Sequence, residues 1–181
     1  APILFLHEYG GDVRSWEPQV RHFARDHRCI VMCSRGYPPS DVPTDETQYG
    51  QDHAIADALA VMDQAGVSTA IVIGLSMGAY TGLRLTIEHS DRITALVAAS
   101  GGAGSPPEGL KVFQEEAFAL SETYLAEGKM LADNFANGPT RTQLKRKDIR
   151  SWTEFRDQLA EHPAFGAAYT LRHVQGRRPS L

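Results

Sequence analysis

Short apolar runs alternate with amphipathic segments over the first hundred residues. Four of these runs predict buried strands: Ile3–Leu6, Cys29–Cys33, Ala70–Ile73 and Ile93–Ala99. Apolar residues at helical spacing between them predict helices around Trp16–Phe23, Ile55–Met62 and Met77–His89, the last with Leu83 and Ile87 on one face. Strands that alternate with helices in this way predict a parallel sheet with flanking helices, so the fold class is α/β.

The pattern changes after Ser100. Residues 101–107 are rich in glycine and proline and are typical of a linker. Beyond them no strand pattern is visible, and the apolar spacing indicates helices around Phe113–Leu120 and Trp152–Leu159. We therefore expect an α/β core at residues 1–104 and a mostly helical region at residues 105–181.

Composition narrows the classes of partner. The chain has 181 residues and a formal net charge of −4, which gives no electrostatic reason to expect nucleic acid or an acidic membrane as partner. No apolar run approaches the ~20 residues that a membrane helix needs. We therefore expect no nucleic acid and no membrane among its partners.

The two cysteines, Cys29 and Cys33, lie four residues apart on one predicted strand. Their Cα atoms would be roughly 13 Å apart, too far for a disulfide. No further Cys/His cluster completes a zinc site, so we expect neither a metal nor a cofactor. Two small core thiols favour a reducing compartment and predict a cytoplasmic protein.

The sequence Gly74-Leu75-Ser76-Met77-Gly78 matches G-x-S-x-G between an apolar strand and an amphipathic helix. In that context a serine sits on a strained turn that exposes its hydroxyl, and the flanking glycines let neighbouring backbone pass closely. The amides and the dipole at the start of the helix would face a reacting oxygen. Ser76 is therefore the predicted nucleophile. The alternative is a glycine-rich strand–helix turn without chemistry, or one that binds phosphate.

A second motif, His7-Glu8-Tyr9-Gly10-Gly11, follows the first strand directly. A serine that transfers acyl groups needs two backbone donors for the tetrahedral oxyanion. We predict that the amides of Tyr9 and Met77 supply them. We interpret His7 as a structural histidine that braces its loop, because the general base must reach Ser76 from another loop.

These motifs, with Trp16-Glu17-Pro18 and Arg35-Gly36-Tyr37-Pro38-Pro39-Ser40, resemble the α/β-hydrolase superfamily in the branch of esterases, enol-lactonases, cofactor-free haloperoxidases and C–C bond hydrolases. The resemblance covers about residues 1–100. It implies an α/β-hydrolase fold, incomplete here, with the helical remainder as a cap. It also implies that the strands containing Leu4 and preceding Gly74 are central in the sheet. Two departures are Glu8, where a glycine is usual, and Cys33, where an aspartate is frequent; Glu8 places a carboxylate near the oxyanion loop.

In that family the catalytic acid and histidine follow the cap, on loops after later strands. The resemblance therefore implies a fragment, with base and acid outside the 181 residues. The internal histidines are not favoured as the base, because they lie on helices beside the sheet or in the predicted cap: His22, His27, His53, His89, His162 and His173.

The predicted function is a serine hydrolase that acts on a small-molecule substrate, a carboxylic ester or lactone, through an acyl-enzyme at Ser76. A C–C bond hydrolase of the same fold stays open, because the same turn serves both reactions. A non-catalytic binding protein of this fold also stays open. We interpret the basic segment Arg141–Arg150 as a solvated helix face rather than an anion site. Strands left unpaired at the sheet edges predict self-association of the chain.

Overall fold

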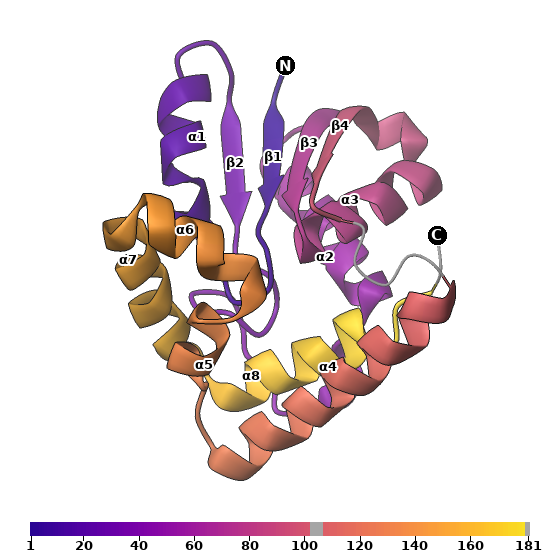
Figure 1. Cartoon of the computed structure of the whole chain (residues 1–181). Helices are drawn as coiled ribbons and strands as arrows, with labels where there is room; N and C mark the ends of the chain where they lie inside the picture. Colours follow the sequence, from indigo (N-terminus) through magenta and orange to yellow (C-terminus); the bar gives the residue numbers. More distant parts are fainter. Residues whose placement is uncertain (102–106, 180–181) are drawn as a thin grey trace.

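The computed structural model describes residues 1–101 and 107–179, and its centre is a parallel sheet of four strands in the order β2-β1-β3-β4 (Figure 1). The strands are β1 (Ile3–Leu6), β2 (Cys29–Met32), β3 (Ala70–Leu75) and β4 (Ile93–Ala99). In the register, Leu4 lies between Ile30 on β2 and Val72 on β3. The α/β fold class and the central position of β1 and β3 are confirmed.

The alternation of β1 side chains divides the core between the two faces of the sheet. Ile3 and Phe5 pack with Trp16 on one face, which is covered by the 3₁₀ turn η1 (Val13–Trp16) and helix α1 (Glu17–Phe23). Leu4 and Leu6 point to the other face, which is covered by α2 (Gln51–Gln64) and α3 (Met77–Glu88). The predicted helices on both faces are therefore present.

The face that α3 turns toward the sheet is not the one that carries Ile87. Leu85 is fully buried, whereas Ile87 is 67% exposed. Two glycines of α3 face the sheet: Gly78 packs directly on the backbone of Leu6 and His7, and Gly82 packs on the side chains of Val72 and Leu96. Spacing of large apolar residues does not reveal a contact that is made by glycines.

The helical region lies across the carboxyl ends of the strands (Figure 1). Its helices are α4 (Pro107–Glu127), α5 (Ala132–Ala136), α6 (Thr142–Lys147), α7 (Ile149–Ala160) and α8 (Ala164–Tyr169), followed by the π-helical turn η5 (Thr170–Gln175). Short 3₁₀ turns are η2 (Glu46–Gln48), η3 (Ser90–Arg92) and η4 (Pro139–Arg141). The predicted helices around Phe113 and Trp152 are confirmed, and the predicted boundary at 104/105 lies outside the described residues.

A large apolar cluster joins the helical region to the sheet. It contains Tyr9, Tyr37 and Met77 from the sheet side, with Tyr124 and Leu159 from the helices. Both cysteines are free thiols, Cys29 half-buried and Cys33 buried. In the part of the chain that the structure describes, no helix combines the length and apolar character needed to cross a membrane.

Candidate active site

Ser76 lies at the carboxyl edge of the sheet, between the end of β3 and the start of α3. Its backbone has φ 53° and ψ −107°, a conformation that non-glycine residues rarely adopt. The Ser76 amide donates to Ala99 O at 2.8 Å, and its carbonyl accepts from the Tyr80 amide at 3.1 Å. Neighbouring elements therefore hold this strained residue on both sides.

The two glycines of the motif allow the turn to form. A Cβ atom on Gly74 would lie 2.7 Å from Ala79 Cα and would overlap the Gly78 carbonyl group. A Cβ atom on Gly78 would lie 2.5 Å from the Leu6 carbonyl carbon and 2.8 Å from His7 O. Any side chain at either position would separate α3 from the strands, so the geometry of the turn depends on both glycines.

The same contact brings the turn at Ser76 against the loop that follows β1, because Gly78 packs on the carbonyl groups of Leu6 and His7. Both predicted oxyanion donors lie in this area. Met77 is the first residue of α3, so its amide has no acceptor within the helix. Among residues 1–101 and 107–179, neither the Tyr9 nor the Met77 amide donates a hydrogen bond.

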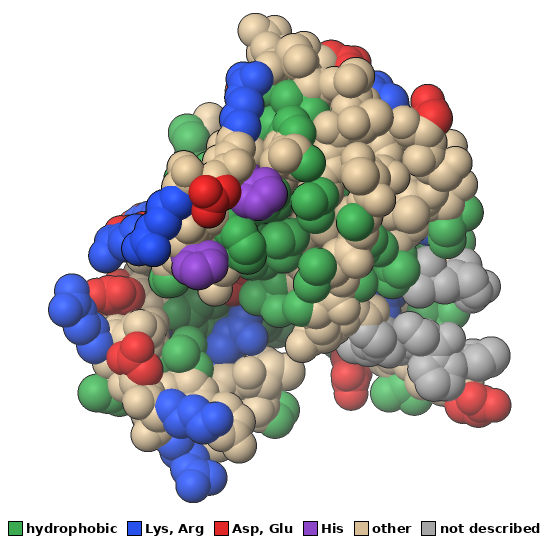
Figure 2. All heavy atoms as spheres, turned by 90° about the horizontal axis from the view of Figure 1, so that it is seen from above, with side chains coloured by type: hydrophobic (Ala, Val, Ile, Leu, Met, Phe, Trp, Pro, Cys, Tyr) green, Lys and Arg blue, Asp and Glu red, His purple; other side chains and the backbone are tan. Residues whose placement is uncertain are grey.

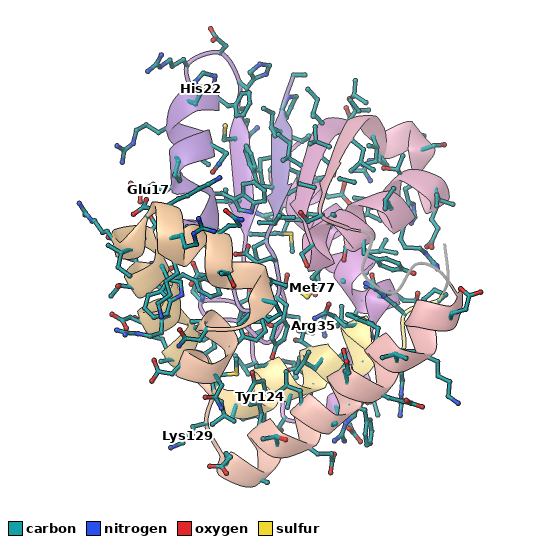
Figure 3. All side chains as sticks on the ribbon, in the orientation of Figure 1. Glu17, His22, Arg35, Met77, Tyr124 and Lys129 are labelled. Carbon is teal, nitrogen blue, oxygen red and sulfur yellow. The ribbon has the colours of Figure 1, made fainter. Side chains whose placement is uncertain are left out.

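The Tyr9 side chain anchors its loop to the helical region. Its hydroxyl donates to Ala167 O at 3.3 Å, and its ring lies 5.5 Å from the Phe135 ring and 6.3 Å from the Tyr37 ring. Burial raises the pKa of the Tyr9 phenol well above its usual range, so the hydroxyl stays protonated. Figure 3 shows Met77 between the sheet and the helical region, and Tyr124 at the helices α4 and α8.

His7 braces the loop, as the sequence predicts. Its Nε2 accepts from the Ser34 amide at 2.8 Å, which assigns the proton to Nδ1, and Nδ1 donates to Glu8 O at 2.7 Å. The ring is fully buried, and this burial lowers its pKa, so His7 is neutral. Both ring nitrogens are therefore committed to backbone groups, and His7 is confirmed as a structural histidine.

Glu8, the departure from the family pattern, is buried, and burial raises its pKa. Arg141 Nη2 lies 3.8 Å from its Oε1 atom, and the Arg141 side chain is only 18% exposed. The interpretation of the basic segment as a solvated face is therefore wrong for Arg141, although Lys145, Arg146, Lys147 and Arg150 are exposed. The signal that could have revealed this pair is Glu8 itself, because a carboxyl group that is buried in its charged form needs a cation beside it.

No described histidine is hydrogen-bonded to Ser76. His162 is buried, with its Nε2 3.9 Å from Asp12 Oδ2 and no hydrogen-bond partner among the described residues. His173 Nε2 lies 2.9 Å from Glu46 Oε2. Asp12 caps the turn η1.

A cavity of about 30 Å³ lies on the α2 side of Met77 and Gly78, large enough for a water molecule. Arg35 and Asp57 line it and form a paired hydrogen bond at 2.7 and 3.0 Å. Arg35 lies close to Met77 in Figure 3. Within the described ranges, no three His, Cys, Asp or Glu side chains are placed to hold one metal ion.

Comparisons with known proteins point to one family. The family model described as "alpha/beta hydrolase fold" matches residues 1–175. The 3-oxoadipate enol-lactonase 1 of Acinetobacter baylyi is 29% identical over 181 aligned residues, which cover 94% of this chain and 61% of the relative. Epoxide hydrolase 4 of Mus musculus is 30% identical over 95 residues, 52% of this chain and 26% of the relative. The chain thus spans less than two thirds of these curated relatives.

Among solved structures, the crystal structure of a hydrolase from Pseudomonas aeruginosa superimposes with a TM-score of 0.79. Its sequence is 24% identical, and the alignment covers 96% of this chain and 64% of that one. At this identity the likeness shows the fold and leaves the chemistry to be argued from the residues themselves.

Proposed function

This chain belongs to the alpha/beta hydrolase fold family, and from this premise we propose that it carries the nucleophile and the oxyanion donors of a serine hydrolase. Ser76 is the nucleophile, the amides of Tyr9 and Met77 are the donors, and the substrate is a small carboxylic ester or lactone. The helical region at residues 105–181 is the cap over this site, and residues 1–104 form the core.

The observation that carries the proposal is the backbone of Ser76. Its positive φ of 53° is strained for a serine, and such strain costs on the order of 1–3 kcal/mol. Gly74 and Gly78, whose Cβ atoms would collide with backbone, hold the turn in this form. A strained serine kept at the start of a helix, beside two amides without a described acceptor, is what acyl transfer requires.

In the proposed reaction, Ser76 Oγ attacks the carbonyl carbon of the substrate while a general base takes the hydroxyl proton. The resulting oxyanion accepts hydrogen bonds from the Tyr9 and Met77 amides and lies at the positive end of the α3 dipole. The protonated base gives its proton to the leaving oxygen as the C–O bond breaks, which leaves an acyl-enzyme at Ser76. Water, deprotonated by the same base, then attacks the acyl carbon, and the acid is released as the proton returns to Ser76 Oγ. We assign the base to residues other than those described, because no described histidine is hydrogen-bonded to Ser76.

The enol-lactonase relative supports the ester and lactone class, because its name gives a lactone as its substrate and it aligns over 94% of this chain. The C–C bond hydrolase and the non-catalytic binding protein remain as rivals. Assays on the protein in its full natural length separate them. Ester hydrolysis supports the proposal, C–C cleavage alone supports the first rival, and neither activity supports the second.

The test replaces Ser76 and uses short-chain p-nitrophenyl esters. We expect Ser76→Ala to lower kcat/KM by a factor of ~10⁴ or more, as removal of a nucleophile does. Ser100→Ala is the matched control, because Ser100 also follows a strand of the sheet and has φ 54° but lies outside the motif. Full activity in Ser76→Ala would refute the assignment.

A second test uses the 181-residue chain by itself. A serine hydroxyl without a general base is a weak nucleophile, so we expect a fluorophosphonate probe to label Ser76 only slowly. Rapid, stoichiometric labelling that Ser76→Ala abolishes would mean that a histidine within the chain acts as the base.

A further inference from the structure

The loop that carries Tyr9 contains a buried carboxylate. Glu8 is 7% exposed, and its Oε2 atom has no hydrogen-bond partner among the described residues. The Gly11 amide donates a hydrogen bond to Glu8 O at 3.0 Å, and the carboxyl group of Glu8 lies beside the turn that this bond forms. A Cβ atom on Gly11 would lie 2.6 Å from Glu8 Oε2, so this glycine makes room for the charge. The loop therefore buries a carboxyl group in the residue that directly precedes the predicted oxyanion donor, Tyr9.

The cation that faces Glu8 comes from the helical region. Arg141 Nη2 lies 3.8 Å from Glu8 Oε1, and the two side chains are 18% and 9% exposed. The Arg141 guanidinium also lies 4.4 Å from the centre of the Phe155 ring and 5.7 Å from that of Phe135. Removing one member of a buried pair leaves an uncompensated charge, which is costly, so each of the two charges requires the other.

The same helices contact the two residues that follow Glu8. The Phe135 ring packs on the Tyr9 ring at 5.5 Å and an interplanar angle of 60°. A Cβ atom on Gly10 would lie 2.7 Å from Leu159 Cδ1, so α7 packs directly against the backbone of the loop. Three consecutive loop residues are thus held by the helical region, and Arg141 contacts both Glu8 and the ring that supports Tyr9.

We propose that Arg141 is a positioning residue for the oxyanion site: it neutralises Glu8 and fixes the Tyr9 amide from the helical region. The inference rests on the proposed function of Ser76 and deepens it. A negative charge that develops beside Tyr9 is disfavoured by an unpaired Glu8 carboxylate in a buried site. With Arg141 in place that repulsion is cancelled, and the amide keeps the orientation that the oxyanion needs.

The experiment compares variants in the full natural length of the protein. We expect Arg141→Met to lower kcat for p-nitrophenyl acetate by about tenfold or more with KM nearly unchanged, because the lost interaction acts in the transition state. Arg141→Lys should retain most of the activity. The double variant Glu8→Gln/Arg141→Met should regain most of the loss, because it no longer buries an unpaired carboxylate. Lys145→Met is the matched control, because Lys145 is exposed and lies 4.3 Å over the Trp152 ring, away from the loop.

Hydrogen exchange of the Tyr9–Gly11 segment provides a readout that does not depend on turnover. We expect faster exchange in Arg141→Met than in the wild type and Lys145→Met. An unchanged kcat and exchange rate, or a loss confined to KM, would overturn the positioning role. If the wild type shows no activity that depends on Ser76, the proposed function fails, while the exchange rates still decide whether Arg141 fixes the loop.

Discussion

Gly78→Ala adds one methyl group at the closest approach of α3 to the sheet. The new Cβ atom would lie 2.5 Å from the Leu6 carbonyl carbon and 2.8 Å from His7 O. Both partners are backbone atoms of β1 and the loop after it, so no side chain can rotate to make room. The helix would have to retreat from the sheet by about 1 Å to restore ordinary contact.

The expected cost follows from what α3 buries. Its Leu85 is fully buried, and a buried leucine makes ~40–60 contacts of ~0.1–0.2 kcal/mol each, of which a gap approaching 1 Å removes a quarter to a half. Alanine is favoured over glycine within a helix by only ~1 kcal/mol, which offsets part of the loss. The loss is centred on about 3 kcal/mol before that offset, so we expect Gly78→Ala to lower the free energy of unfolding by about 2 kcal/mol, within the ~1–3 kcal/mol typical of overpacking.

Urea unfolding followed by tryptophan fluorescence measures this change. Trp16 packs on the sheet and Trp152 lies in the helical region, so variants that retain a single tryptophan report the two parts separately. The control is Gly50→Ala, where the nearest atom to an added Cβ is His53 Nδ1 at 3.7 Å, and it should cost about 1 kcal/mol or less. A Gly78→Ala protein as stable as this control would refute the close contact between α3 and β1.

Two further outcomes follow from the structure. Figure 2 shows hydrophobic side chains gathered on the face seen from above, and Val97 on the edge strand β4 is 51% exposed. We therefore expect size-exclusion chromatography with light scattering to show self-association of the 181-residue chain, and Val97→Lys to reduce it. A monodisperse wild-type monomer would contradict this expectation. Burial lowers the pKa of His162 below 6.5, so its contribution to stability is complete above pH 6.5 and is lost as the pH falls from there toward the folded pKa. Thermal unfolding between pH 5 and 8 should therefore show a smaller acid loss in His162→Gln, and an identical loss would exclude this histidine as a cause.

The sheet could be predicted from the sequence because its strands are short, continuous apolar runs. Ile3–Leu6 and Ile93–Ala99 begin and end where the apolar pattern does. The turn at Ser76 could be recognised because two glycines at fixed spacing have a steric purpose there. In both cases the signal lies within a few neighbouring residues, so reading along the chain is sufficient.

Contacts between distant segments could not be predicted in this way. Arg141 belongs to a run of basic residues, and only the fold brings it to Glu8, 133 positions earlier in the chain. The exposure of Ile87 has a similar origin, because α3 is oriented by glycine contacts with β1 rather than by its largest apolar residues. Residue type alone does not tell which of several arginines or leucines the fold will bury.

The two sides of the candidate site are held by different forces. The turn at Ser76 is fixed by backbone contacts at Gly74 and Gly78, which tolerate no side chain and leave little freedom. The loop with Tyr9 is held instead by side chains of the helical region, through Phe135 and the Glu8–Arg141 pair. Substitutions in the helices should therefore alter the oxyanion side of the site while the nucleophile stays in place. Such a division would let changes in the helical region tune the reaction without loss of the strained serine.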